Sequence, residues 1–226
     1  MKLFFLLLIT MCLCSGCGNK YEKYLKNNTA EIRNYLFVGS DDNIDVSLIS
    51  GKREKTYIVN GYATELVDFG VLTFLPKKNL ELDYTIANYV LFVGTNKFEG
   101  ALQKNPFDGS LVVDIKTNIS PTANVSAKIN IGEFSREIKL NCVNANWNIQ
   151  SNDVYDILSK KFKSEIGECV VDKSFAGEVY IKILNDADAN VSDYYWYVCI
   201  LTRTGGRLSL IISPETGETL AINNLL

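Results

Sequence analysis

The chain of 226 residues contains no histidine, and this absence excludes several kinds of site. Neither a Ser-His-Asp nor a Cys-His nucleophile can be assembled without an imidazole. The common zinc sites that use imidazole ligands and histidine-based pH switches are excluded for the same reason. We therefore predict a protein that is not an enzyme and that holds no metal and no cofactor.

The sequence also lacks an excess of basic charge and a long apolar run in the body of the chain. Lys and Arg number 23 against 26 Asp and Glu, and they are scattered rather than gathered in a stripe. A nucleic-acid partner is therefore not expected. Apolar residues make up 47% of the chain, which is typical of a globular protein. No run approaches the 18 or more apolar residues that indicate a membrane-spanning helix.

Cysteine is sparse beyond the N-terminal region: the rest of the chain contains only Cys142, Cys169 and Cys199. An odd number of thiols cannot pair completely within one chain. Cys142 and Cys199 lie in apolar, strand-like runs, which favours buried free thiols that behave as small apolar side chains. One intramolecular disulfide remains the alternative.

The N-terminus does contain one apolar run, from Leu3 to Leu13, which follows the single charge of Lys2. This run is too short for a bilayer span, which needs about 20 residues, and it suits the apolar part of a secretory signal, about 7–15 residues long. The small residues Ser15 and Gly16 come directly after it. The pattern predicts an export signal over residues 1–16.

The segment Leu13-Cys14-Ser15-Gly16-Cys17 resembles a bacterial lipobox. This resemblance implies diacylglycerol on the Cys17 sulfur, cleavage before Cys17, and anchoring on the extracytoplasmic face of a bacterial cell membrane. The position three before the modified cysteine is usually leucine and here is Cys14, so an ordinary signal peptide that releases a soluble protein is the alternative. Residues 17–33 are polar, and we expect a tether in which Thr29 caps a short helix that begins near Ala30.

Residues 34–144 show the pattern of an antiparallel β-sandwich. Short segments rich in Val, Ile, Tyr, Phe and Thr are separated by turn residues, and Asn43 to Ser50 alternates with period two. Asn60-Gly61 is typical of a type I′ hairpin turn. Further strands are expected at 66–75, 80–86, 88–95, 110–118, 125–131 and 134–143.

Residues 150–226 show a different pattern, which predicts a small α+β unit with one helix packed on an antiparallel sheet. Apolar side chains recur on one helical face from Val154 to Ile166, with Asn152 as the expected N-cap and Gly167 as the expected end. Strands are expected at 177–184, 194–203, 207–213 and 218–222. The polar segment 145–151 is expected to link the two domains.

The stretch from Trp196 to Glu218 resembles the end of PepSY-like modules, in which a strand leads into a Pro-x-Thr-Gly-Glu turn, here Pro214 to Glu218. The resemblance covers about 30 residues and rests mostly on this turn. It implies a small helix-plus-sheet module that binds or restrains another protein, such as a protease, and has no catalytic residues of its own.

The candidate binding surface is the aromatic segment of Tyr194, Tyr195, Trp196 and Tyr197. Both faces of this predicted strand are apolar or aromatic, so one face can pack on the helix. The other face is either covered by the first domain or exposed, and an exposed apolar patch marks a binding surface. The partner expected from this surface and the export signal is a protein or peptide of the cell envelope.

The sequence offers only weak signs of a cation site or of carboxylate chemistry. Asp186 to Asn190 has the D-x-D-x-N opening of a calcium loop, but Val191 replaces the glycine and Tyr197 the final glutamate, so a polar loop is expected. The alternative function is a carboxylate-based hydrolase acting on envelope polysaccharide, which needs two acids about 5–10 Å apart. No pair stands out among the 26 acids.

Overall fold

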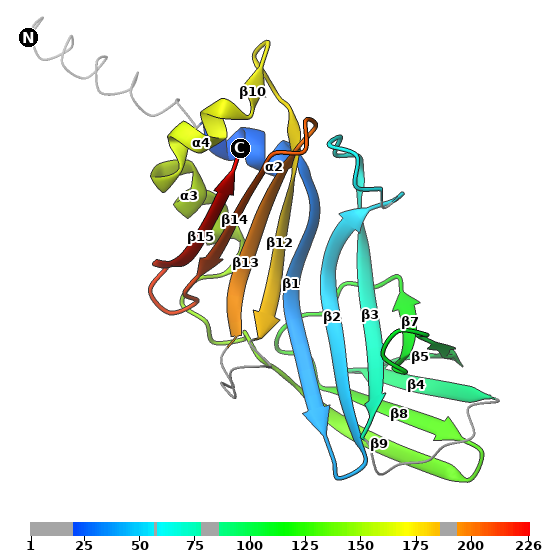
Figure 1. Ribbon diagram of the computed structural model, residues 1–226. Helices are drawn as coiled ribbons and strands as arrows, with labels where there is room; N and C mark the ends of the chain where they lie inside the picture. Colours follow the sequence, from blue (N-terminus) through cyan, green and yellow to red (C-terminus); the bar gives the residue numbers. More distant parts are fainter. Residues whose placement is uncertain (1–19, 57, 78–85, 186–193) are drawn as a thin grey trace, which may run out of the picture.

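A computed structural model describes residues 20–56, 58–77, 86–185 and 194–226 (Figure 1). The export signal, Cys17, most of the strand expected at 80–86 and the loop from Asp186 to Asn190 lie outside the described residues. The predicted fold class is confirmed: the chain is mainly β, its sheets are antiparallel with one parallel pairing, and a helix packs on a sheet near the C-terminus. No described helix has the length and apolar character that a bilayer crossing requires.

The β-sandwich consists of two sheet layers that share one edge. The first layer contains, in spatial order, β1 (Thr29–Ser40), β2 (Ile44–Glu54), β3 (Leu66–Pro76), β7 (Leu111–Ile115) and β6 (Gln103–Lys104). The second layer contains β5 (Asn96–Ala101), β4 (Ala87–Val93), β8 (Val125–Ile131) and β9 (Phe134–Cys142). Strand β9 also pairs with β1 and joins the layers, whose inner faces bury a core that includes Phe37, Phe74, Leu91 and Ile129.

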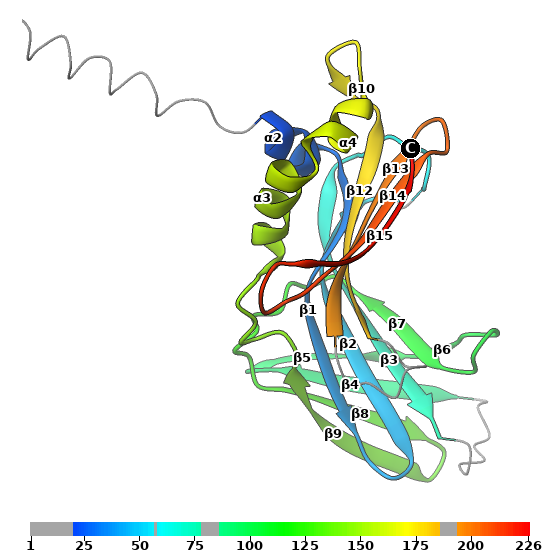
Figure 2. The same cartoon turned by 60° about the vertical axis from the view of Figure 1, so that its left-hand side comes forward.

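The helix-plus-sheet unit has three helices on one face of four antiparallel strands (Figure 2). The helices are α2 (Lys20–Asn27), α3 (Ser151–Lys161) and α4 (Lys163–Glu168). The strands are β12 (Gly177–Asn185), β13 (Tyr194–Thr202), β14 (Arg207–Ile212) and β15 (Thr219–Leu225). A hairpin of β10 (Val170–Val171) and β11 (Ser174–Phe175) connects α4 to β12. We call the sheet face turned away from the helices the far face.

The predicted helix is present but is interrupted and begins earlier than expected. Phe162 leaves helical geometry, with φ −119° and ψ 37°, and separates α3 from α4. The N-cap is Gln150, not Asn152, because the backbone N–H of Gln150 is bonded by the carboxylate of Asp153 at 2.8 Å. The second helix ends at Glu168, one residue after the predicted stop at Gly167.

The expected tether at residues 17–33 is wrong for its described part, because residues 20–33 belong to the folded body. Leu25 of α2 is fully buried in the core beneath α3, and Ala30 is fully buried in β1. Thr29 does not start a helix, since it follows the end of α2. Its Oγ donates to the carbonyl of Leu25 at 2.9 Å and lies 2.7 Å from the hydroxyl of Tyr155.

Strand β1 belongs to both units, so the sheet runs continuously through the boundary expected between the domains. Its first half pairs in parallel with β12, and its second half pairs with β9 of the sandwich. Between the halves, the fully buried Asn144 accepts the backbone N–H of Leu36 at 3.2 Å and donates to the carbonyl of Asn34 at 2.7 Å. Gly51 of β2 packs against this junction between the halves of β1. A side chain does not fit there, because an added Cβ would lie 2.0 Å from the carbonyl oxygen of Ile32.

The hairpin expected at Asn60-Gly61 is instead part of a longer loop that crosses to the other unit. Strand β2 ends at Glu54 and β3 begins at Leu66, so the residues beside the turn do not form paired strands. Gly61 has the positive φ of 79° that the turn chemistry predicts. Its neighbours bond to Glu178 on β12: the backbone N–H groups of Asn60 and Tyr62 donate to Oε1 at 3.1 and 3.0 Å.

Candidate binding cleft

The two faces of strand β13 have different environments, which removes Trp196 from the predicted binding surface. Trp196 is fully buried on the helix side, and its indole N–H donates to the carbonyl of Ile149 at 2.8 Å. Side chains alternate along a strand, so Tyr195 and Tyr197 point to the far face, where both are half-buried. Tyr194 is the first residue of the strand and is also half-buried. Three of the four predicted surface residues, all of them tyrosines, therefore remain accessible.

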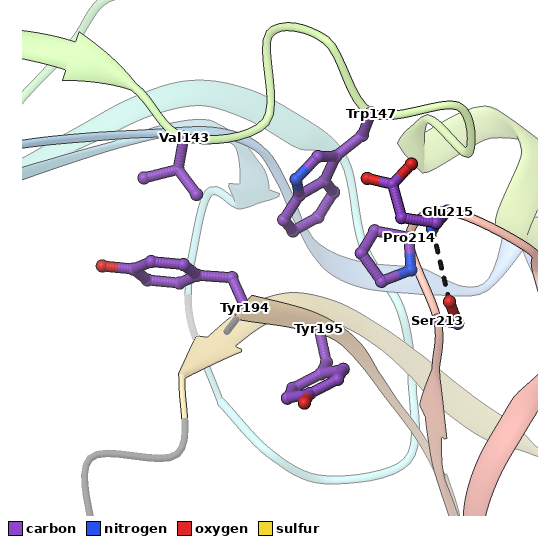
Figure 3. A pocket seen from close by; sticks show the side chains of 7 residues that line it. All are labelled: Val143, Trp147, Tyr194, Tyr195, Ser213, Pro214 and Glu215. Carbon is purple, nitrogen blue, oxygen red and sulfur yellow. Dashed lines mark hydrogen bonds between the residues drawn. The ribbon is translucent and has the colours of Figure 1, made fainter. Parts of the chain in front are cut away.

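Tyr194 and Tyr195 line a cleft of about 550 Å³ at the junction of the two units (Figure 3). We call it the tyrosine cleft, and its lining consists of Val143, Trp147, Tyr194, Tyr195, Ser213, Pro214 and Glu215. Three segments contribute: the chain that follows β9, the start of β13, and the turn between β14 and β15. Ligand sites commonly enclose about 300–1,000 Å³, so the cleft is large enough for one or two side chains of a partner.

Bonds to buried elements hold the walls of the tyrosine cleft in place. The ring of Trp147 packs edge-on against Trp196, with 5.2 Å between the centroids. The side chain of Gln150 donates to the carbonyl of Trp147 at 2.7 Å. The backbone N–H of Ile149 donates to the carbonyl of Pro214 at 2.9 Å and so ties the linker to the β14–β15 turn. A cleft fixed in this way loses little conformational entropy when a ligand binds.

Glu215 gives the tyrosine cleft a negative charge at its rim. Its side chain is exposed, and Figure 3 shows the carboxylate beside the ring of Trp147. Asn148 orients Glu215 by donating to its carbonyl at 3.2 Å and to its Oε2 at 3.1 Å. The hydroxyl of Ser213 accepts the N–H of Glu215 at 3.3 Å, which stabilises the turn. The cleft thus combines the ring surfaces of Trp147, Tyr194 and Pro214 with one carboxylate acceptor.

A second, smaller groove of about 370 Å³ continues from Tyr195 over the far face. Its lining consists of Leu184, Asn185, Tyr195, Tyr197, Ile211 and Leu220. Tyr197 is fixed by its neighbour on β14, because its hydroxyl lies 3.3 Å from that of Ser209. Among the described residues, the loop between β2 and β3 contacts the sheet at Glu178 and at Arg203, away from the tyrosine end of the far face. At that end, Tyr195 and Tyr197 are half-buried.

Acidic side chains gather in one groove, and two of them have structural partners. A groove of about 550 Å³ beside β2, β3 and β7 contains Glu54, Asp68 and Asp114 among its lining residues. Glu54 is buried and accepts the backbone N–H of Thr64, whereas Asp114 pairs with Arg53 at 2.9 Å. No group of three or more Cys, Asp or Glu side chains within the described ranges could hold a metal ion.

The three cysteines of the folded body are free thiols, so the alternative of a disulfide among them is not realised. Cys169 is buried, and burial together with the nearby charge of Glu168 raises its pKa to about 11. Burial also raises the pKa of Cys142. Both thiols are therefore protonated at neutral pH, which makes them poor nucleophiles.

Comparison with family models, with curated proteins and with solved structures found no match to this chain. The lipobox-like and PepSY-like resemblances accordingly stay predictions.

Proposed function

We propose that this chain is an exported, lipid-anchored protein of a bacterial envelope that binds a protein or peptide partner and performs no catalysis. The export signal at residues 1–16 and the thiol of Cys17 support the location. Helix α2 begins at Lys20, only three residues after Cys17, so the distance between the anchor and the folded body is at most about 10 Å. The body would therefore lie directly at the membrane surface.

The tyrosine cleft is the observation that supports partner binding most strongly. Trp147, Tyr194 and Pro214 give it rigid ring surfaces, and tryptophan and tyrosine are enriched among the few residues that carry most of the binding energy at protein interfaces. Glu215 stands at the rim, where it can accept charge-assisted hydrogen bonds. The chemistry fits a segment that carries an apolar or aromatic side chain beside a lysine or arginine.

Selection of random displayed peptides on the purified full chain tests this specificity. We expect enrichment of apolar or aromatic residues next to Lys or Arg. Charge reversal by Glu215→Lys should exchange the enriched basic residue for Asp or Glu. The matched control is Glu133→Lys, an exposed acid in the turn between β8 and β9, which should leave the selected peptides unchanged. The same peptides from all three proteins would contradict the assignment of the cleft.

The anchor has a separate test, so its failure can be distinguished from failure of the binding site. Cells that express the full chain should incorporate labelled fatty acid into the wild type and lose that label in Cys17→Ala. Equal labelling of the two proteins would contradict Cys17 as the lipid attachment site and would leave the cleft unaffected.

A further inference from the structure

The open edges of the described sheets are not alike. Strand β6, at one end of the long sheet, has only two residues, and Pro106 follows it closely. Strand β5 ends the second sandwich layer and carries the ion pair of Lys97 and Glu99, with 2.6 Å between the charged atoms. Short strands, charges and nearby prolines are the usual devices that prevent an edge from pairing with another chain.

Strand β15, at the other end of the long sheet, has neither a charge nor a proline, and its pairing with β14 shifts register once, between Ala221 and Thr219. It has seven residues, Thr-Leu-Ala-Ile-Asn-Asn-Leu, without a charge or a proline. Among the described strands it pairs with β14 alone, so its outer backbone N–H and C=O groups have no strand partner. Leu220, Ile222 and Leu225 are 52%, 54% and 59% exposed. An uncharged edge of this length that carries exposed apolar side chains is a template for another strand.

We propose that β15 pairs with β15 of a second copy of this chain, antiparallel and about a twofold axis, so that the two sheets become one. A twofold contact must be complementary to itself, and two antiparallel copies of one edge can match donors with acceptors. Because β15 is uncharged, the pairing places no like charges opposite each other. Pairing centred on Ile222 brings the two Ile222 side chains together.

The charges at the two ends of β15 support a second copy of the chain as the partner. Glu218 directly precedes the strand, and Arg207 on β14 lies opposite Leu225 near its end. In an antiparallel pairing centred on Ile222, the start of β15 in one copy meets the end of β15 in the other. Each Glu218 therefore comes to the end of the second copy where Arg207 is located, which places opposite charges at both ends of the contact.

The joined sheet keeps the helices of both copies on one side. Helices α2, α3 and α4 all cover the same face of β12 to β15 (Figure 2). A twofold axis perpendicular to the sheet leaves each copy's helices on that face. Both α2 helices, and with them the two proposed anchors at Cys17, then face the same membrane.

The test is the mass of the full chain in a non-ionic detergent, measured by sedimentation with protein from about 1 to about 100 µM. We expect a dimer for the wild type. Ile222→Lys and Ile222→Glu should each weaken the dimer roughly 100-fold, because like charges then meet at the axis. Mixing these two variants should restore a dimer that contains one copy of each. Circular dichroism should show that both variants are folded.

The matched control is Ile86→Lys, which places the same charge on a 68% exposed apolar residue outside β15 and should leave the dimer intact. A wild type that is monomeric over the whole concentration range would overturn the proposal. A dimer that persists in both Ile222 variants, or a Lys and Glu mixture that stays monomeric, would overturn it equally.

Discussion

The β-sandwich and the helix-plus-sheet unit bury their cores in different ways, and the difference shows where the chain can bind. The sandwich core is enclosed between two sheets joined through β1 and β9, and its outer strands are short or charged. The helix-plus-sheet unit covers only one face of its strands with helices. Its far face therefore leaves Tyr195 and Tyr197 accessible, and its edge strand β15 is open.

The largest predicted effect separates the two faces of β13. Trp196→Ala removes a fully buried indole and its hydrogen bond to Ile149, and should lower the free energy of unfolding by about 3–5 kcal/mol. Tyr197→Ala removes a half-buried ring from the far face and should lower the free energy of unfolding by about 1 kcal/mol. Urea denaturation of both variants measures the difference. Equal losses would mean that the far face is as buried as the helix side.

The next effect tests how the two units are joined. Asn144→Ala removes two hydrogen bonds to the backbone of β1 and leaves buried polar groups unpaired, so unfolding should become easier by about 2–3 kcal/mol. Asn146→Ala, at an exposed position in the same segment, should change stability by less than about 0.5 kcal/mol. Denaturation curves that coincide for the two variants would show that Asn144 does not couple the units.

A smaller effect concerns the loop that the sandwich extends over β12. Glu178→Ala removes the acceptor of the Asn60 and Tyr62 amides. The free energy of local opening of this loop should fall by about 1–3 kcal/mol. Hydrogen exchange at these two amides should accelerate, while exchange in the sandwich strands stays unchanged. Glu65→Ala, an exposed acid of the same loop, is the control. Unchanged protection at Asn60 and Tyr62 in Glu178→Ala would contradict the anchoring role.

The smallest effect per unit of change is a pH dependence in the helix-plus-sheet unit. Burial raises the pKa of Cys169 from 9.0 to about 11 and that of Tyr155 from 10.0 to about 12. The folded state favours the neutral form of both groups. The stability that each group contributes is therefore complete below pH 9 and is lost as the pH rises through its pKa in the folded protein. Stability should fall by about 1 kcal/mol per pH unit for each group within its window. Cys169→Ala should reduce the slope between pH 9 and 11, whereas an unchanged slope would contradict the assignment.

The strands could be predicted from the sequence because their alternation is local. Strands β2, β8, β13 and β14 lie close to the predicted ranges, with apolar side chains at every second position. Strand β5 was missed because it is an exposed edge whose Lys97 and Glu99 interrupt the apolar pattern. The break at Phe162 was missed because its side chain continues the helical spacing while its backbone does not.

The other features that sequence-based prediction missed depend on contacts between residues far apart in the sequence. Residues 20–33 look polar because Leu25 is the only fully apolar side chain of α2, yet that residue docks beneath α3. Asn60-Gly61 has the chemistry of a turn, but Glu178 determines where the turn lies. The tyrosine cleft is formed by three separate segments, so the sequence indicated its tyrosines and gave no sign of Trp147 or Glu215 as their neighbours.

The most direct test of the central claim is site-specific photo-cross-linking in cells that express the full chain. A photoreactive amino acid at Tyr195 probes the helix-plus-sheet unit, and one at Phe107, which is 96% exposed, probes the sandwich. The proposed function predicts a discrete cross-linked partner from position 195 that Glu215→Lys abolishes, and no such product from position 107. A partner captured from position 107 alone, or equally from both positions, would contradict binding at the tyrosine cleft.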